Sequence, residues 1–184
     1  WDRQFAYFIL KYELNFVDNL GKAVALTTDK IDVENGKTFD INFVDKEGKK
    51  QHPLILHLSP TGAVERVLLA ILEKAAAKEA KNERALFPLW LAPTQVRLAL
   101  LNDDVLGFAE ELREKLKAEN IRVDIDDRNV PIGKKIREAE LEWVPYILGI
   151  GKKEIESGKL NVRFRETGKE KQMLLDELVQ EIAS

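Results

Sequence analysis

The first part of the chain alternates apolar and polar positions with the two-residue period of β-strands. Aromatic and β-branched residues supply the apolar positions, and short turns containing Gly separate the runs. The strands predicted in this way cover residues 5–10, 12–18, 23–33, 39–44 and 53–57. Because the connections are short, the pattern predicts an antiparallel meander.

After residue 58 the apolar period changes to that of an amphipathic helix, predicted over 62–81. Its apolar face carries Val64, Val67, Leu68, Ile71 and Leu72. The charged stretch 78–84 ends this helix, so we expect a domain boundary near Arg84. The predicted domains are therefore residues 1–84 and 85–184.

The second part alternates strand and helix. Strands are predicted over 95–101, 121–126, 144–150 and 160–165. Helices are predicted from Asp103 or Asp104 to Glu119, over 133–142, and along the stripe Leu174, Leu175, Leu178, Val179 and Ile182. This alternation indicates an α/β fold with a mostly parallel sheet and helices on both faces, after an α+β first part.

Composition and charge narrow the function classes. The 184 residues contain no cysteine, which excludes disulfides, and no apolar run long enough to span a membrane. No secretion signal is present, so we expect a cytoplasmic location. The chain begins at Trp1 without a methionine, which we interpret as an internal piece of a longer protein.

The net charge of −3 argues against a generic nucleic-acid binder, which would usually be basic. Residues 128–137 nevertheless hold four basic residues and no acid. Such a run is often only a solvated face, but it is also compatible with a selective RNA contact when the cations share one surface.

A candidate binding site lies where the strand 54–56 meets the helix at 62. His57 ends the strand, Gly62 follows a short turn, and Arg66 lies in the first turns of the helix. A helix N-terminus with a nearby Gly and Arg suits an anionic ligand. The alternative is an ordinary capping box, with Ser59 or Thr61 as the cap.

This stretch resembles the third signature motif of class II aminoacyl-tRNA synthetases, in which a Gly and a following Glu-Arg pair open a helix. The histidine five residues before that Gly is similar to the threonyl-tRNA synthetase family, and the likeness is strongest to its archaeal-type branch. Further segments resemble the anticodon-binding domain of the same family: 87–96, 127–137, 144–146 and 151–158. The resemblance implies the end of a catalytic domain, with the motif at 62–66, followed by a five-stranded anticodon-binding domain.

The resemblance also implies cofactors. Gly62 and Arg66 fall on positions that contact ATP, which the family binds with magnesium. His57 falls on one zinc ligand, and the other zinc ligands would lie upstream of this chain. We therefore expect no bound cofactor in the chain alone, and we expect His52 to be exposed and inert.

The amino-acid pocket departs from the family pattern. Thr28 and Asp32 match it, whereas Lys30 replaces a usual Gln and Asp29 a usual apolar residue. A buried amide exchanged for a cation needs compensation. Two interpretations remain open: harmless drift in an aminoacylating enzyme, or an editing paralogue with a degenerate pocket that does not aminoacylate.

By the same resemblance, Asn129, Glu154 and Arg163 are expected to read anticodon bases of threonine tRNA, and Arg137 to contact the backbone. Lys134 and Lys135 are expected to meet phosphates. The family is dimeric through its catalytic domain, so a homodimer is expected. A third interpretation is a structural dimer subunit without tRNA specificity, whose basic residues only aid solubility.

Overall fold

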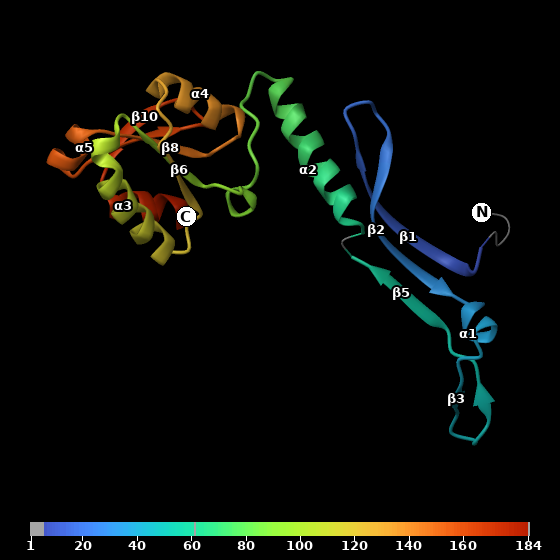
Figure 1. The fold of residues 1–184 in the computed structure, drawn as a ribbon. Coiled ribbons are helices and arrows are strands. Elements are labelled where there is room, and N and C mark those ends of the chain that lie inside the picture. Colours follow the sequence, from blue (N-terminus) through green and yellow to red (C-terminus); the bar gives the residue numbers. More distant parts are fainter. Residues whose placement is uncertain (1–5, 61, 184) are drawn as a thin grey trace. The chain divides into compact units, whose positions relative to one another are not determined.

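The computed structural model describes residues 6–60 and 62–183, and the chain divides into two compact units, Trp1–Ala77 and Lys78–Ser184 (Figure 1). The division falls before Arg84, where we expect the domain boundary. Arg84 belongs to the second unit because its guanidinium donates to the backbone carbonyl of Arg165, 3.0 Å away.

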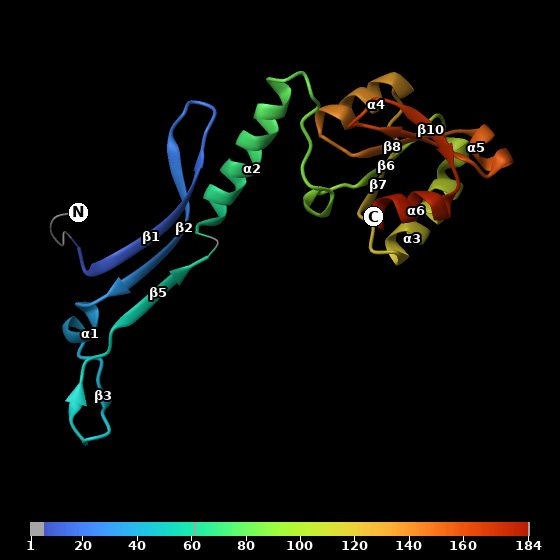
Figure 2. The same ribbon diagram turned by 180° about the vertical axis from the view of Figure 1, so that it is seen from behind.

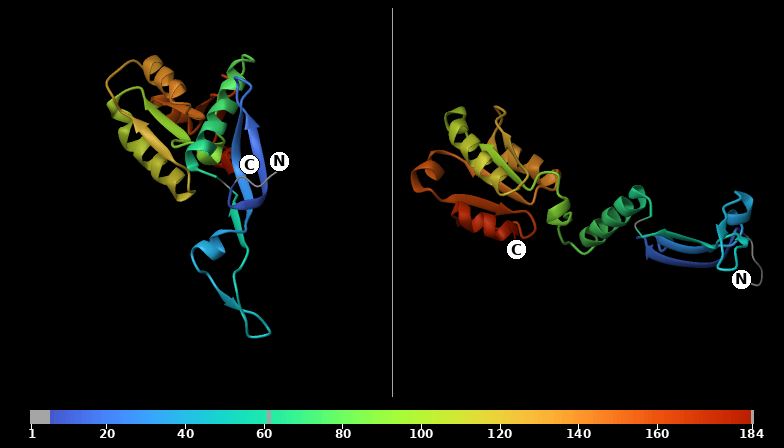
Figure 3. Two further views of the ribbon diagram at one scale, coloured as in Figure 1. Left: turned by 90° about the vertical axis from the view of Figure 1, so that its right-hand side faces the viewer. Right: turned by 90° about the horizontal axis from the view of Figure 1, so that it is seen from below.

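The first unit contains a three-stranded antiparallel sheet in the order β1-β2-β5. Its strands are β1 Phe8–Val17, β2 Ala23–Asp32 and β5 Ile55–Ser59, and the helix α2 Val64–Glu79 follows. The two separate strands predicted before residue 18 form the single strand β1, which is irregular at two positions of its pairing with β2. Figure 3 shows the three strands, coloured blue to teal, as a single layer.

The strand predicted over 39–44 is wrong for most of its length. A short helix, α1 Asn35–Thr38, precedes it, and only β3 Phe43–Val44 pairs, with β4 Lys50–Gln51. The Asp32 carboxylate accepts the backbone N–H groups of Glu34 and Asn35, which starts the helical turn. Asp40 then adopts a positive φ of 50°, which interrupts an extended chain.

Much apolar surface of the first unit is exposed. Ala75 is the one hydrophobic residue buried among the described residues of this unit. The predicted apolar face of α2 is exposed at Val64, Leu68 and Leu72. A second set of exposed apolar side chains lies on one face of the sheet, as the strand pairing and the alternation of side chains show. These residues are Leu10, Tyr12, Leu14, Leu56 and Leu58.

The second unit contains a five-stranded sheet in the order β10-β9-β8-β6-β7. Its strands are β6 Val96–Leu100, β7 Val123–Asp126, β8 Tyr146–Ile150, β9 Leu160–Phe164 and β10 Glu170–Met173. Its helical segments are η1 Leu89–Leu91, η2 Asp103–Val105, α3 Leu106–Ala118, α4 Ile132–Leu141, α5 Lys152–Ser157 and α6 Leu175–Ala183.

This sheet is mixed rather than mostly parallel. β6 runs parallel to β7 and β8, whereas β9 is antiparallel to β8 and to β10. A tight turn with Gly168 at φ +68° joins β9 to β10, and such a hairpin must be antiparallel. Neither β10 nor α5 was predicted, because both are short and largely polar.

The two faces of the sheet pack against different helices (Figure 2). On one face, Leu98, Leu148 and Val162 belong to the main core with residues of α3 and α6. On the other face, Ile147 packs with Ala139 of α4 and with Val144. The α4 face is the more polar one, and it carries the candidate site. Among the described residues, no helix combines the length and the apolar character needed to cross a membrane.

Candidate functional site

Strand register brings the predicted pocket residues of the first unit onto one face. Lys30 lies opposite His57 on β5, and Thr28 lies opposite Ser59. Partners that face each other across an antiparallel pair project to the same side, and residues two apart along a strand do as well. Thr28, Lys30, Asp32 and His57 therefore share one face of the sheet.

The ammonium group of Lys30 lies against aromatic side chains. Its Nζ is 3.4 Å from the hydroxyl oxygen of Tyr7 and 5.3 Å from the ring centroid of Phe8. Asp29 lies opposite Tyr12 and Leu58, on the other face of the sheet, so its carboxylate does not compensate Lys30. Among the described residues, this cation contacts aromatic side chains, which stabilise it through their rings and the Tyr7 hydroxyl.

Asp32 is buried, and its carboxylate accepts three hydrogen bonds. Oδ1 accepts the backbone N–H groups of Glu34 and Asn35 at 3.0 and 2.9 Å, and Oδ2 accepts the Asn35 side-chain amide. Burial by itself raises the pKa of Asp32, but these hydrogen bonds outweigh it and hold the pKa below its usual value, with a smaller contribution from His57. Asp32 is thus a fixed anion on the pocket face.

The two histidines differ in their surroundings. His57 exposes its imidazole on the same face as Asp32, whereas His52 is exposed in the small hairpin and donates from Nδ1 to the carbonyl of Ile41. Within 6–60 and 62–183 no three His, Cys, Asp or Glu side chains lie close enough to hold a metal ion. Since zinc takes at least three protein ligands, the described residues around His57 do not by themselves form a zinc site.

The turn before α2 requires glycine. Gly62 has φ +60°, and a Cβ at this position would overlap the backbone carbonyl of Leu26. Arg66 lies in the first turn of α2, is exposed, and donates from Nη1 to the carbonyl of Ala25 at 3.3 Å. Of the two candidate caps, Ser59 belongs to β5, and Thr61 lies outside the described residues.

In the second unit, Asn129 follows β7 and Glu154 follows β8. Both come after strands that run parallel to β6, so both lie at the carboxyl edge of the parallel part of the sheet. The Asn129 side chain is exposed. Arg128, its neighbour, donates to Asp126 and to Glu138 at 2.7 and 2.6 Å and ties this loop to α4.

Glu154 is half-buried and caps its own helix. Its Oε2 accepts the backbone N–H of Gly151 at 2.9 Å. This contact fixes the carboxylate at the start of α5 and leaves further lone pairs on its two oxygens as acceptors.

The neighbouring lysines of α4 have opposite environments. Lys134 is exposed, 3.8 Å from Glu138, and Arg137 is also exposed. Lys135 is buried, and its Nζ donates to the carbonyls of Leu100 and Asp126 at 2.8 and 3.1 Å. The phosphate contact expected for Lys135 is therefore corrected: it lies on the inner side of the helix, four residues before buried Ala139.

Arg163 projects from β9 on the α4 face, where it lies between two carboxylates. Its Nε donates to Oε1 of Glu140 at 2.8 Å, and its Nη1 donates to Oε1 of Glu170 at 3.1 Å. Sequence reasoning missed both acids. The apolar–polar alternation of β9 predicts which face of the sheet Arg163 lies on. No local pattern predicts its partners Glu140 and Glu170, which are 23 and 7 residues away in the chain.

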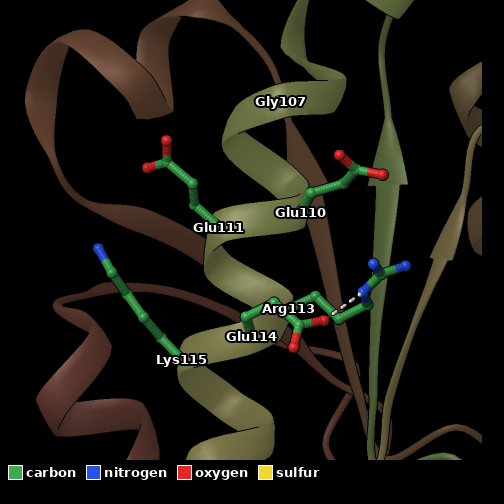
Figure 4. Close-up of a pocket in the computed structure, with 6 residues that line it drawn as sticks. All are labelled: Gly107, Glu110, Glu111, Arg113, Glu114 and Lys115. Carbon is green, nitrogen blue, oxygen red and sulfur yellow. Dashed lines mark hydrogen bonds and ion pairs between the residues drawn. The ribbon is translucent and has the colours of Figure 1, made fainter.

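A separate shallow hollow lies on the outer surface of α3 (Figure 4). It is lined by Gly107, Glu110, Glu111, Arg113, Glu114 and Lys115. Arg113 donates to Glu114, its neighbour in the chain, and the side chains point outward from one helix. Because α3 packs on the sheet face opposite to α4, this hollow is not part of the candidate surface.

Comparisons with known proteins identify these two units. Residues 95–184 match the family model of the anticodon binding domain. The threonine–tRNA ligase of Thermococcus gammatolerans is 55% identical over 99% of this chain, and that of Nitrosopumilus maritimus is 53% identical over the same share. The chain belongs to the threonyl-tRNA synthetase family. The resemblance inferred from the motifs is thus confirmed.

A solved structure supports the same threonyl-tRNA synthetase assignment. The RNA binding domain of threonyl-tRNA synthetase from Cryptosporidium parvum matches with a TM-score of 0.76 and 27% identity, covering 97% of this chain and 43% of that one. The likeness confirms the predicted fold class, an antiparallel sheet with a long helix followed by an α/β domain. The chain spans under a third of the length of the curated threonyl-tRNA synthetases it matches.

Proposed function

We propose that this chain recognises the anticodon of a threonine tRNA through the α4 face and carboxyl edge of its second unit. The observation that carries the proposal is that Asn129, Glu154 and Arg163 lie on this one domain, which matches the anticodon-binding family over 95–184. Anticodon bases are unstacked and offer their Watson–Crick edges to such side chains.

The roles follow from chemistry. The exposed Asn129 amide offers a donor and an acceptor, Glu154 accepts from amino or imino groups, and Arg163 offers N–H donors in a fixed geometry. Lys134 and Arg137, both exposed on α4, contact phosphates of the loop backbone. Lys135 has no part in this surface, because its ammonium is buried.

We propose further that the first unit contributes part of a threonine and ATP site in a longer threonine–tRNA ligase. Arg66 holds ATP phosphates, and Gly62 permits the turn that presents the backbone N–H groups at the start of α2 to them. The face with Thr28, Lys30 and Asp32 contacts the amino acid. His57 fits as one ligand of zinc, which would supply a Lewis acid for the amino and hydroxyl groups of threonine. Magnesium would accompany ATP.

A filter-binding measurement with the full chain tests the tRNA proposal. Threonine tRNA and transcripts with substituted anticodon bases are compared at two salt concentrations. We expect tighter binding to the threonine anticodon at both salts. Indifference to the anticodon would remove the proposal and favour the third interpretation, a structural subunit of a dimer.

The chain alone is expected to form no threonyl-adenylate, because the remaining zinc ligands and further ATP contacts would come from other residues of the longer protein. ATP–pyrophosphate exchange by the 184-residue chain would contradict this.

The longer protein is proposed to be a homodimer. Sedimentation equilibrium of the longer protein gives its mass in solution and so tests this. We also propose a cytoplasmic location for it, where translation takes place.

An editing paralogue remains a second candidate, favoured by one observation. Lys30 places a cation among aromatic rings on the pocket face, with Asp29 directed to the opposite side of the sheet. Such a protein would bind threonine tRNA through the same surface but would only hydrolyse mischarged tRNA. Charging assays on the longer protein distinguish the two: threonylation of tRNA excludes the editing role as the main activity.

A further inference from the structure

The polar face around Arg163 extends to a residue that the family pattern did not single out. On β9, Asn161 is two positions before Arg163 and therefore projects from the same face of the sheet. The register agrees, because Glu170 lies opposite Arg163 and Gln172 lies opposite Asn161 on β10. Val162, between them, is in the core on the other face.

One carboxylate links the two side chains. Glu170 accepts from Nη1 of Arg163 at 3.1 Å through Oε1, and from Nδ2 of Asn161 at 3.0 Å through Oε2. The hydrogen bonds from Asn161 and Arg163 lower the pKa of Glu170, so it remains an anion at neutral pH. A bidentate acceptor of this kind fixes the amide and the guanidinium relative to each other.

The place beside Asn161 is open. On β8 the residue opposite Asn161 is Gly149. Among the described residues other than its chain neighbours, a Cβ on Gly149 would have only a Leu101 methyl carbon within 4 Å, at 3.8 Å. No side chain therefore projects from β8 beside the Asn161 amide, and Leu101 supplies the nearest side-chain atom that the described residues place there.

The local charge selects the kind of ligand. Arg163 pairs with Glu140 and Glu170, and Glu140 also pairs with Arg84, so two carboxylates already balance the two cations of this cluster. A phosphate here would meet both anions at short range, which is unfavourable. An uncharged base edge meets no such repulsion, and the second N–H and the Oδ1 of the Asn161 amide match its acceptors and donors.

We infer that Asn161 is a further base-reading residue of this surface, and that Glu170 is the positioning residue that aligns Asn161 with Arg163. The inference rests on the proposed anticodon recognition. It identifies the ligand group at this point as an unpaired nucleobase rather than a backbone phosphate.

The test is a binding series on the full chain with threonine tRNA and with transcripts substituted at each anticodon base. N161A is expected to lower affinity about tenfold and to reduce the preference at one base position, with an unchanged dependence on salt. E170A is expected to reduce the same preference and to steepen the salt dependence, because Arg163 then keeps only Glu140 as a carboxylate partner and its Nη1 can contact phosphate.

The matched control is K171A on β10, the neighbouring strand that also carries Glu170. Lys171 lies opposite Val162, so it projects away from Asn161, and K171A is expected to keep the base preference. Asn161→Thr serves as a second variant, since Thr suits a strand and lacks the amide. Thermal melts by circular dichroism establish that each variant is folded.

The outcomes distinguish a failure of the role inferred for Asn161 from a failure of the proposed anticodon recognition. If N161A and Asn161→Thr keep full affinity and base preference while R163A loses preference, the inference is overturned and the proposed function stands. If the unmodified chain itself ignores the anticodon, the proposed function fails, and this inference fails with it.

Discussion

Glu140 on α4 and Arg163 on β9 form a 2.8 Å charge-assisted hydrogen bond, from the arginine Nε to the carboxylate Oε1. The same oxygen accepts Nη1 of Arg84 at 3.3 Å. Burial by itself raises the pKa of Glu140, but the two arginines outweigh it and hold the pKa below its usual value. Arg163 is therefore oriented before any RNA binds, and less entropy is lost when it meets a base.

Replacing Arg163 by alanine should weaken discrimination between the matched anticodon and a substituted one by about 1–3 kcal/mol, the cost of a lost base contact. Competition binding with paired transcripts measures the difference. Arg163→Lys should restore little, since an ammonium lacks the planar fork of donors. An unchanged preference in R163A would count against this role.

Replacing Lys134 by alanine should weaken binding of all tRNAs alike and lower the slope of log affinity against log salt by about one, because one phosphate contact is lost. Titrations at several salt concentrations give this slope. Lys115→Ala, on α3 at the opposite face of the sheet, is the matched control. A loss confined to threonine tRNA would contradict the phosphate role.

Replacing Lys135 by methionine should instead reduce stability, by about 1–3 kcal/mol, because the carbonyls of Leu100 and Asp126 lose a buried donor. Urea unfolding followed by circular dichroism measures the change. The salt dependence of tRNA binding should stay as in the unmodified chain. Full stability together with a flatter salt dependence would restore the role first expected from sequence.

The second unit should also become less stable in acid, because the Asp126 carboxylate is then protonated. The hydrogen bonds from Arg128 lower the pKa of Asp126, although burial opposes them. A carboxyl group with a lower pKa in the folded state stabilises the fold above its unfolded pKa of about 3.9, and this contribution is lost as pH falls through the folded value.

Asp126→Asn should therefore destabilise the second unit at pH 7 and make its stability less dependent on pH between about 5 and 2. Urea unfolding across that range gives the dependence. The same dependence in D126N as in the unmodified chain would assign the acid effect to other carboxyl groups, such as Glu140.

How far the sequence predicts the fold depends on the length and apolar content of each element. The buried strands β6 and β8 and the helix α3 were predicted within a few residues, because their apolar periods are long. The elements β10 and α5 were missed, since polar strands at a sheet edge and short helices carry little periodic signal. The turn after Asp32 was missed because it is formed by hydrogen bonds from the backbone N–H groups of Glu34 and Asn35 to the Asp32 carboxylate.

Some residues of the candidate site could likewise be predicted from the sequence, and others could not. The family resemblance led to the predicted roles of Arg163 and Asn129, but it gave no sign of Glu140, Glu170 or Asn161, whose contacts with Arg163 or with one another depend on strand register and on helix packing. Lys134 and Lys135 are neighbours with the same charge. Only the rotation of α4 against the sheet decides that one is exposed and the other buried.

The burial of Lys135 makes this pair of lysines a built-in chemical reporter. An amine-reactive reagent can reach Lys134 in the native domain, whereas Lys135 reacts only when α4 separates from the sheet. The ratio of labelling at the two adjacent sites, read by peptide mass spectrometry, would therefore follow opening of the domain without any introduced probe.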